Sequence, residues 1–172
     1  MSEGSGVVFV TLEKIKNSPG YPSDKSFEKG PVAVIECIQE IPCNPCETSC
    51  RFDAITVGEP ITNLPKLDVE KCKGCGECAI NCPGLAIFVV DKSYSDNKAL
   101  VSIPYEFLPL PEIGSTVEGL DRMGQRVCSA VVKKIVKRKY ADGTILITVE
   151  LTKEYADHVR SIKIKNNVNM QM

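Results

Sequence analysis

Four cysteines near the middle of the chain have a spacing that suits iron–sulfur chemistry. Cys72, Cys75, Cys78 and Cys82 form the run C-x2-C-x2-C-x3-C, and Pro83 follows directly. The first three thiols lie on one tight loop that can wrap three corners of a cubane cluster, and the proline removes a backbone donor where the chain must turn. Zinc sites usually combine two short Cys pairs separated by a longer stretch, so this dense quartet favours an iron–sulfur cluster over zinc.

A second cysteine group lies upstream and reads as an altered copy of this run. The aligned pairs are Cys43 with Cys75, Cys46 with Cys78, Cys50 with Cys82, and Ala54-Ile55 with Ala86-Ile87. Glu40 then stands opposite Cys72, so the first thiol of the copy is expected to be Cys37, with three extra residues lengthening the loop before Cys43. A duplication of this kind predicts two similar half-units, each too small to bury a core alone.

The upstream group departs from the run in two ways. Arg51 replaces the proline expected after the last thiol, and the interval from Cys37 to Cys43 is long. Cys37 could instead be a buried thiol of an apolar strand, because free cysteine is among the most buried residues. The upstream group would then hold a [3Fe-4S] cluster or a cubane with a different fourth ligand. Cys128 stands alone in an apolar run, and we expect it to be a core thiol.

Composition limits the classes of protein to which the chain can belong. Its 172 residues are 43% hydrophobic and 25% charged, which indicates a globular protein of one ordinary domain or two small ones. The net charge of −1 favours neither nucleic acid nor membrane as a partner. No apolar stretch approaches the roughly 20 residues that span a bilayer, and residues 1–6 lack the features of a signal peptide. Eight of the nine cysteines lie in metal-type clusters, which points to the reducing cytoplasm.

The apolar patterns predict short strands before and after the cysteines. Strands are expected at 7–16, 32–37, 54–57, 66–69, 85–91, 99–103, 116–120, 126–139, 144–151 and 161–164, with a turn-rich connection at 17–30. Hairpin turns are expected at 121–124 and 141–143, and Thr152 is expected to cap one helical turn. The proline-rich stretch 104–111 reads as a stiff linker. The strands after residue 99 suit a small SH3-like barrel.

Other candidate sites carry weaker signals. The stretch 133–139 is basic at five of its seven positions and could contact phosphates, but a solvated hairpin is the better interpretation. His158 is the only histidine and is expected at the surface. Gly74 and Gly76 are expected to let the backbone turn its amides toward the cluster sulfurs. The sequence contains no P-loop, dinucleotide fingerprint or nucleophile–base pair, so we expect no catalytic residues.

Residues 31–91, with the two cysteine groups described above, resemble the two-cluster bacterial-type ferredoxins. The stretch 34–50, together with Cys82-Pro-Gly-Leu-Ala-Ile87, looks like the small iron–sulfur subunits of multisubunit, flavin-dependent proline, hydroxyproline and sarcosine-type dehydrogenases. In two-cluster ferredoxins the fourth Cys of each run serves the other cluster. The resemblance therefore implies two [4Fe-4S] clusters. Cluster one would be held by Cys37, Cys43, Cys46 and Cys82, and cluster two by Cys72, Cys75, Cys78 and Cys50.

The resemblance also implies a fold and a role. The expected fold is α+β, with an N-terminal strand and connection at 1–30, a ferredoxin-like core at 31–98, a small SH3-like β-barrel at 99–165 for docking, and a tail at 166–172. The expected role is that of an electron-transfer subunit, not catalytic alone, in a hetero-oligomer with flavin-containing dehydrogenase subunits. A chain ending near Asp91 is then expected to keep its clusters. Two alternatives stay open: an iron–sulfur enzyme with a substrate-binding cluster, and a structural or nucleic-acid-binding module.

Overall fold

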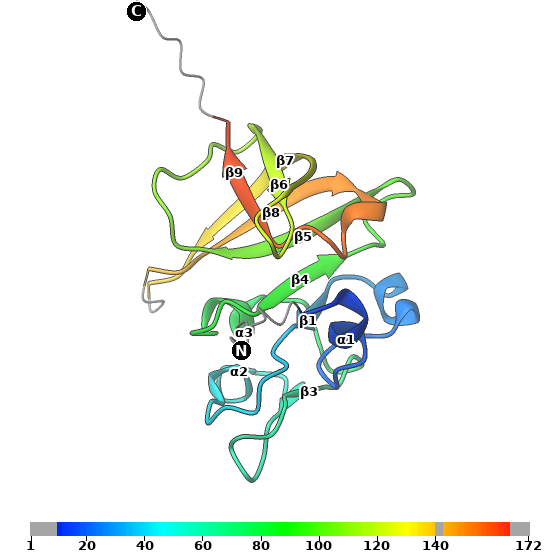
Figure 1. The fold of residues 1–172 in the computed structure, drawn as a ribbon, viewed down its shortest axis with the longest axis vertical. Helices are drawn as coiled ribbons and strands as arrows, with labels where there is room; N and C mark the ends of the chain where they lie inside the picture. Colours follow the sequence, from blue (N-terminus) through cyan, green and yellow to red (C-terminus); the bar gives the residue numbers. More distant parts are fainter. Residues whose placement is uncertain (1–9, 140–142, 166–172) are drawn as a thin grey trace, which may run out of the picture.

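A computed structural model describes residues 10–139 and 143–165, and Figure 1 shows their arrangement. The elements in chain order are α1 (Leu12–Lys16), η1 (Asp24–Glu28), β1 (Val32–Ile35), α2 (Pro45–Thr48), β2 (Ile55–Thr56), β3 (Lys66–Leu67), α3 (Glu77–Ile80), β4 (Ile87–Asp91), β5 (Lys98–Tyr105), β6 (Thr116–Leu120), β7 (Arg126–Lys137), β8 (Ile145–Thr152), η2 (Lys153–Tyr155) and β9 (Ser161–Ile164). The helices are single turns, so strands dominate. None of the described helices is both long and apolar enough to cross a membrane.

One antiparallel sheet contains strands from both sides of the expected domain boundary. Its order is β1-β4-β5-β8-β7-β6-β9, and β2 pairs with β3 in a separate two-stranded sheet. The boundary expected between residues 98 and 99 follows the turn of the β4–β5 hairpin, where Val90 pairs with Val101. The cysteine-bearing part and the strands after it therefore share backbone hydrogen bonds.

Strands β1 and β4 are buried on both faces, which is why they read as continuous apolar runs. Side chains alternate across a strand. Val32 and Val34 accordingly join the core formed with β5 to β9, whereas Ala33 and Ile35 join a second cluster of side chains around the cysteines. In β4, Val90 belongs to the first cluster and Ile87 to the second. These two strands form a shared wall between the strand-rich core and the cysteine sites.

The two edges of the sheet meet through an ion-paired arginine. Arg160, just before edge strand β9, donates from Nε to the carboxylate of Glu36, just after edge strand β1, over 2.5 Å. Its guanidinium also lies 4.9 Å from the centroid of the Phe88 ring. Arg122, in the β6–β7 turn, donates to Glu36 as well. The sheet is therefore rolled, since contacts of this length join its first and last strands.

Most strands predicted after residue 99 are confirmed, as is the turn at Asp121, whose carboxylate accepts from two backbone amides of the turn. Gly143 is described, but residues 141 and 142 of the second turn lie outside the described residues. The helical turn after Thr152 is confirmed, with Thr152 at its N-cap position, but the Thr152 side chain makes no capping hydrogen bond. The linker expected at 104–111 begins inside β5, because Pro104 pairs with Leu146. Among the described residues, the pairing of β5 with β4 ends at Ser102. Beyond Ser102 that edge of β5 needs no backbone N–H donor, so a proline is tolerated there.

The strand expected at 7–16 was wrong where the structure describes it. Residues 12–16 form helix α1, and residues 7–9 lie outside the described part. The reason is a local cap: the Thr11 hydroxyl accepts from the amide of Lys14, which favours a helical start. Only Ile15 of this helix is buried, so the segment has too little apolar contact with the rest of the protein to hold it in an extended strand.

Asp157 ties this N-terminal segment to the strand-rich part. Its carboxylate accepts hydrogen bonds from Lys16 (3.2 Å), Lys92 (2.9 Å) and the Tyr21 hydroxyl (3.0 Å). Burial by itself would raise the pKa of Asp157, but Lys92 and Lys16 outweigh it and lower that pKa to about 2. The folded structure therefore stabilises the ionised form of this carboxylate relative to the unfolded chain.

Replacing Asp157 by Asn is expected to lower the free energy of unfolding by about 2 kcal/mol near neutral pH, from the pKa lowering and about 1.4 kcal/mol per pKa unit. Because the folded pKa lies below the unfolded one, this contribution is complete above about pH 5 and is lost only as the pH falls toward 2. Denaturant unfolding at several pH values between about 5 and 8 should thus give a constant difference between parent and variant. A difference that varies across this range would contradict the assignment.

Candidate metal centres

The structure confirms the internal repeat in its backbone. Helix α2 and helix α3 occupy matching positions 32 residues apart, as do Cys50 and Cys82. The residues three positions after these cysteines, Asp53 and Leu85, both have left-handed backbones, with φ of 48° and 49°. In each half the cysteine sulfur accepts from the amide four residues on, at 3.3 Å in the first half and 3.4 Å in the second. Two equivalent cysteine loops therefore exist.

The two halves exchange strands, and this exchange brings each fourth cysteine to the opposite run. Strand β4, which follows Cys82, pairs with β1, which precedes Cys37. Strand β2, which follows Cys50, pairs with β3, which precedes Cys72. The matching pairs are Ile87 with Ile35 and Ile55 with Leu67. Each pocket is thus built from the end of one half and the start of the other.

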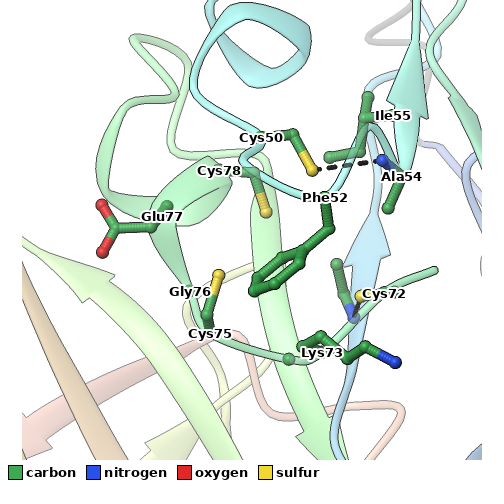
Figure 2. A pocket seen from close by; sticks show the side chains of 12 residues that line it. Cys50, Phe52, Ala54, Ile55, Cys72, Lys73, Cys75, Gly76, Glu77 and Cys78 are labelled. Carbon is green, nitrogen blue, oxygen red and sulfur yellow. Dashed lines mark hydrogen bonds between the residues drawn. The ribbon is translucent and has the colours of Figure 1, made fainter.

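The pocket called the second pocket from here on gathers the four cysteines expected for cluster two. Cys50, Cys72, Cys75 and Cys78 all line it, together with Phe52 and the apolar side chains of Ala33 and Ile55. Figure 2 shows the four sulfurs around this space, with the Phe52 ring among them. The Cys72 sulfur accepts from the Ala33 amide of β1 at 3.4 Å. Cys75 is exposed and Cys78 is buried, so one edge of the pocket opens to solvent.

Two glycines shape the loop of this pocket. Gly74 and Gly76 have φ of +59° and +81°, a region that favours glycine. A Cβ at Gly74 would collide with Pro31, and one at Gly76 would collide with Leu146 of β8. The loop therefore packs closely on one side against the chain before β1 and on the other against the strand-rich core.

The other pocket, called the first pocket from here on, gathers the four cysteines expected for cluster one. Cys37, Cys43, Cys46 and Cys82 line it, with Ile35 and Ile87 among its apolar walls. Strand β1 ends at Ile35, so Cys37 lies beyond the strand and not within it. The long interval before Cys43 forms a loop whose Gln39 and Ile41 also line the pocket. The irregular spacing thus does not separate Cys37 from the other three thiols.

The thiols of both pockets are costly to ionise without a metal. Burial, with the neighbouring charge of Cys82, raises the pKa of Cys46 to about 11. Burial also raises the pKa of Cys37 and, most strongly, that of Cys78, which the charges of Cys72 and Cys75 raise further. Iron bound at these positions would supply the positive charge that holds the thiolates ionised, so cluster assembly is coupled to proton release.

Each pocket offers a donor set of four thiols. Across residues 10–139 and 143–165, no three His, Cys, Asp or Glu side chains converge closely enough to hold one metal ion. A cubane is wider than one ion, so its four thiolates stand further apart around it. Four thiols on two loops, with backbone amides donating to their sulfurs, are typical of iron–sulfur sites.

Residues outside the two pockets lie close to where the sequence predicted, with one exception. Cys128 packs against the strand-rich core but is only half-buried, and His158 is exposed. In the basic stretch, Lys133 pairs with Glu150 at the surface. The exception is Arg138, which lies 3.0 Å from the buried carboxylate of Glu77, between two cysteines of the run. No spacing rule links these two residues, because the contact depends on where the chain just after β7 lies relative to α3.

The repeat, the strand exchange and the cysteine quartets together define an iron–sulfur protein with a ferredoxin-type binding segment. Residues 65–88 match the 4Fe-4S binding domain family, and this segment contains the whole run from Cys72 to Cys82. The chain therefore binds a 4Fe-4S cluster through this segment. The comparison covers neither Cys37 nor Cys43, so the number of clusters and the full ligand sets stay predictions.

Three relatives are similar over the cysteine region. One subunit of the Na⁺-translocating ferredoxin:NAD⁺ oxidoreductase complex of Acetobacterium woodii is 53% identical over 38 residues, which are 22% of this chain and 11% of the relative. An uncharacterised ferredoxin of Methanocaldococcus jannaschii is 44% identical over 48 residues, 28% of this chain and 30% of the relative. The ferredoxin-type protein NapF of Escherichia coli is 37% identical over 51 residues, 28% and 31% respectively. The matches thus span less than a third of these relatives, and no solved structure matches the chain.

Replacing Cys37 by Ser is expected to remove one cluster or convert it to a three-iron form, because the first pocket loses a thiolate. Replacing Cys128 by Ser is the matched control: iron content should stay unchanged, and stability should fall by about 1–3 kcal/mol for a poorly paired hydroxyl. Iron and sulfide analysis of both anaerobically purified variants checks this. Iron loss in Cys128→Ser but not in Cys37→Ser would show that the ligand set is wrong.

Proposed function

We propose that the chain is the electron-transfer subunit of a cytoplasmic oxidoreductase complex, with two [4Fe-4S] clusters held by the two cysteine pockets. The observation that carries the proposal is the pair of four-thiol pockets built from interleaved halves. Their closeness supports a relay, because the buried Cys46 of the first pocket and the buried Cys78 of the second belong to one cluster of packed side chains. The ferredoxin-type names of the relatives support the same role.

The partner we propose is a flavin-containing dehydrogenase that oxidises an amine or amino acid. A flavin collects two electrons as a hydride, whereas each bound cluster would accept one electron at a time, so two clusters suit the splitting of a pair. The support is the resemblance of residues 34–50 to small subunits of such enzymes, together with the ferredoxin-type segment. The proposed fold is a two-cluster ferredoxin-like core whose shared wall carries a small SH3-like barrel.

The residues of the chain would bind, insulate and tune the clusters. The cysteine thiolates would hold the iron. Backbone amides of Ala33, Ala54 and Ala86 already donate to cysteine sulfurs, and such hydrogen bonds favour the more negative state of a cluster. Ile35 and Ile87 would exclude water from the inner side of the first pocket. The proposal gives none of these groups the task of taking a proton or hydride from a substrate.

The alternative enzymes and binding modules lack a specific supporting observation. A substrate-binding cluster would be favoured by a pocket with only three thiols, but Cys37 lines the first pocket with the other three. Binding of nucleic acid would rest on the basic stretch 133–139, where Arg138 and Lys133 are engaged by Glu77 and Glu150.

The test is anaerobic purification of the tagged full-length chain from its native host, with identification of the proteins that remain bound. We expect a flavoprotein, and we expect proline, hydroxyproline or sarcosine to reduce the clusters only when that flavoprotein is present. The chain purified alone, assayed with the same substrates and an artificial electron acceptor, is the control and should be inactive. Amine oxidation by the isolated chain, or clusters that no reductant can reduce, would overturn the proposal.

A further inference from the structure

A buried carboxylate lies inside the cysteine run of the second pocket. Glu77 is only 5% exposed, although it sits between Cys75 and Cys78 in the sequence. Figure 2 shows its carboxylate on the side of α3 away from the sulfurs. There it meets Arg138 of the β7–β8 hairpin, whose guanidinium Nη2 lies 3.0 Å from the Glu77 carboxylate. An acid at this position is unexpected, because a cluster held by thiolates is itself negatively charged.

The hairpin that carries Arg138 is fixed against the cysteine loop. Leu146, on the other arm of the hairpin, packs on Gly76, where a Cβ would collide with it. Leu146 and the partly buried Val136 belong to the cluster of side chains around the cysteines. The ion pair is therefore not a chance meeting of two mobile surface groups, since apolar contacts on both arms hold the hairpin in place beside it.

Charges in this position act strongly on their surroundings. A buried carboxylate costs free energy unless a cation and hydrogen bonds compensate it, and Arg138 supplies one such cation. Within a protein the effective dielectric constant is far below that of water. Two unit charges several ångströms apart therefore interact with an energy on the order of 1 kcal/mol or more. Cluster two would therefore experience both members of the pair.

We propose that the Glu77–Arg138 ion pair is a positioning and tuning element that sets the reduction potential of cluster two. The inference rests on the proposed function, since it assigns to the strand-rich part a role in electron transfer besides docking. Reduction adds one negative charge to the cluster. Glu77 opposes this addition and Arg138 favours it, and their balance would set the driving force for electrons that enter or leave by the exposed edge at Cys75.

The test is an anaerobic redox titration of the full-length protein, followed by paramagnetic resonance so that the two clusters are measured separately. Glu77→Gln should raise the potential of cluster two and Arg138→Gln should lower it, each by about tenfold in the reduction equilibrium, which equals 59 mV for one electron. Cluster one should move by less than half as much. Arg138→Lys, which keeps the charge, should return the potential most of the way to that of the parent.

The matched control is Lys133→Gln, on the same arm of the β7–β8 hairpin. This variant removes one positive charge, as Arg138→Gln does. The lysine that it replaces pairs with Glu150 and not with Glu77. Opposite signs for the Glu77 and Arg138 variants, with a small change in the control, would support the inference, because a merely structural role gives no sign reversal. Shifts of one sign, or shifts equal to that of Lys133→Gln, would overturn it. Iron content is measured in each sample: a parent without reducible clusters would refute the proposed function itself, whereas a loaded parent with unmoved potentials refutes only this inference.

Discussion

Replacing Cys82 by Ala is expected to damage the cluster of the upstream cysteines and to leave the cluster of its own run intact. The sequence places Cys82 in the run that begins at Cys72, but the structure places it in the pocket of Cys37, Cys43 and Cys46. The reason is the pairing of β4 with β1, which carries the end of the second half to the start of the first. The effect is large, because a four-thiol site loses one of its ligands.

Paramagnetic resonance of the dithionite-reduced variant measures this directly. The signal of the cluster at Cys72, Cys75 and Cys78 should persist, and the other signal should be lost or change to that of a three-iron cluster. Cys50→Ala is the reciprocal variant and should give the opposite pattern, since Cys50 lies in the second pocket. Loss of only the Cys72–Cys78 cluster in Cys82→Ala would refute the exchange of ligands.

Ending the chain at Asp91 is expected to abolish stable binding of both clusters. The resemblance to ferredoxins suggested that such a chain keeps its clusters, but the continuous sheet argues against this. Removing β5 to β9 would expose one face of β1 and β4, including Val32, Val34, Phe88 and Val90. At about 1.5–3 kcal/mol per large buried side chain, this loss is comparable to the whole stability of a typical domain. The shared wall would have water on one side.

Iron content and solubility of the 1–91 fragment, expressed and purified anaerobically, check this prediction. The control is the same fragment co-expressed with residues 92–172, which supply β5 and the remaining strands. Co-expression should restore soluble protein with both clusters, because the cut then falls in the β4–β5 turn and leaves the sheet complete. A 1–91 fragment that alone binds as much iron as the full chain would contradict the role of the shared wall. Separate docking and redox domains would then be the better description.

Much of the site could be predicted because it depends on local spacing. Aligning the two cysteine groups matched Ala54 with Ala86, and the structure gives these residues the same hydrogen bond to the cysteine four positions earlier. The alignment also matched Asp53 with Leu85, which share a left-handed backbone. Cysteine loops are short and their geometry follows from the turn, so a repeat in sequence becomes a repeat in structure.

The continuity of the fold could not be predicted in the same way. Whether β4 pairs with β5 to form one sheet, or two sheets separate at that hairpin, depends on which faces of the strands find apolar partners. The run at Val32–Ile35 is apolar at every position, and this pattern does not say that its two faces serve different cores. The contact between Glu77 and Arg138 has the same origin, since it joins residues 61 positions apart through tertiary packing. The apolar residues before α1 predicted a strand there, but the cap at Thr11 outweighed them and a helix formed.

Iron and acid-labile sulfide analysis of the anaerobically purified full-length protein, combined with stepwise reduction, tests the central claim most directly. The two four-thiol pockets predict about eight irons and eight sulfides per chain, with a broad absorbance that dithionite bleaches. Reduction should proceed through two one-electron steps, each with its own paramagnetic signal. About four irons and a single reducible centre would contradict the two-cluster arrangement. One zinc with little iron would contradict an electron-transfer function altogether.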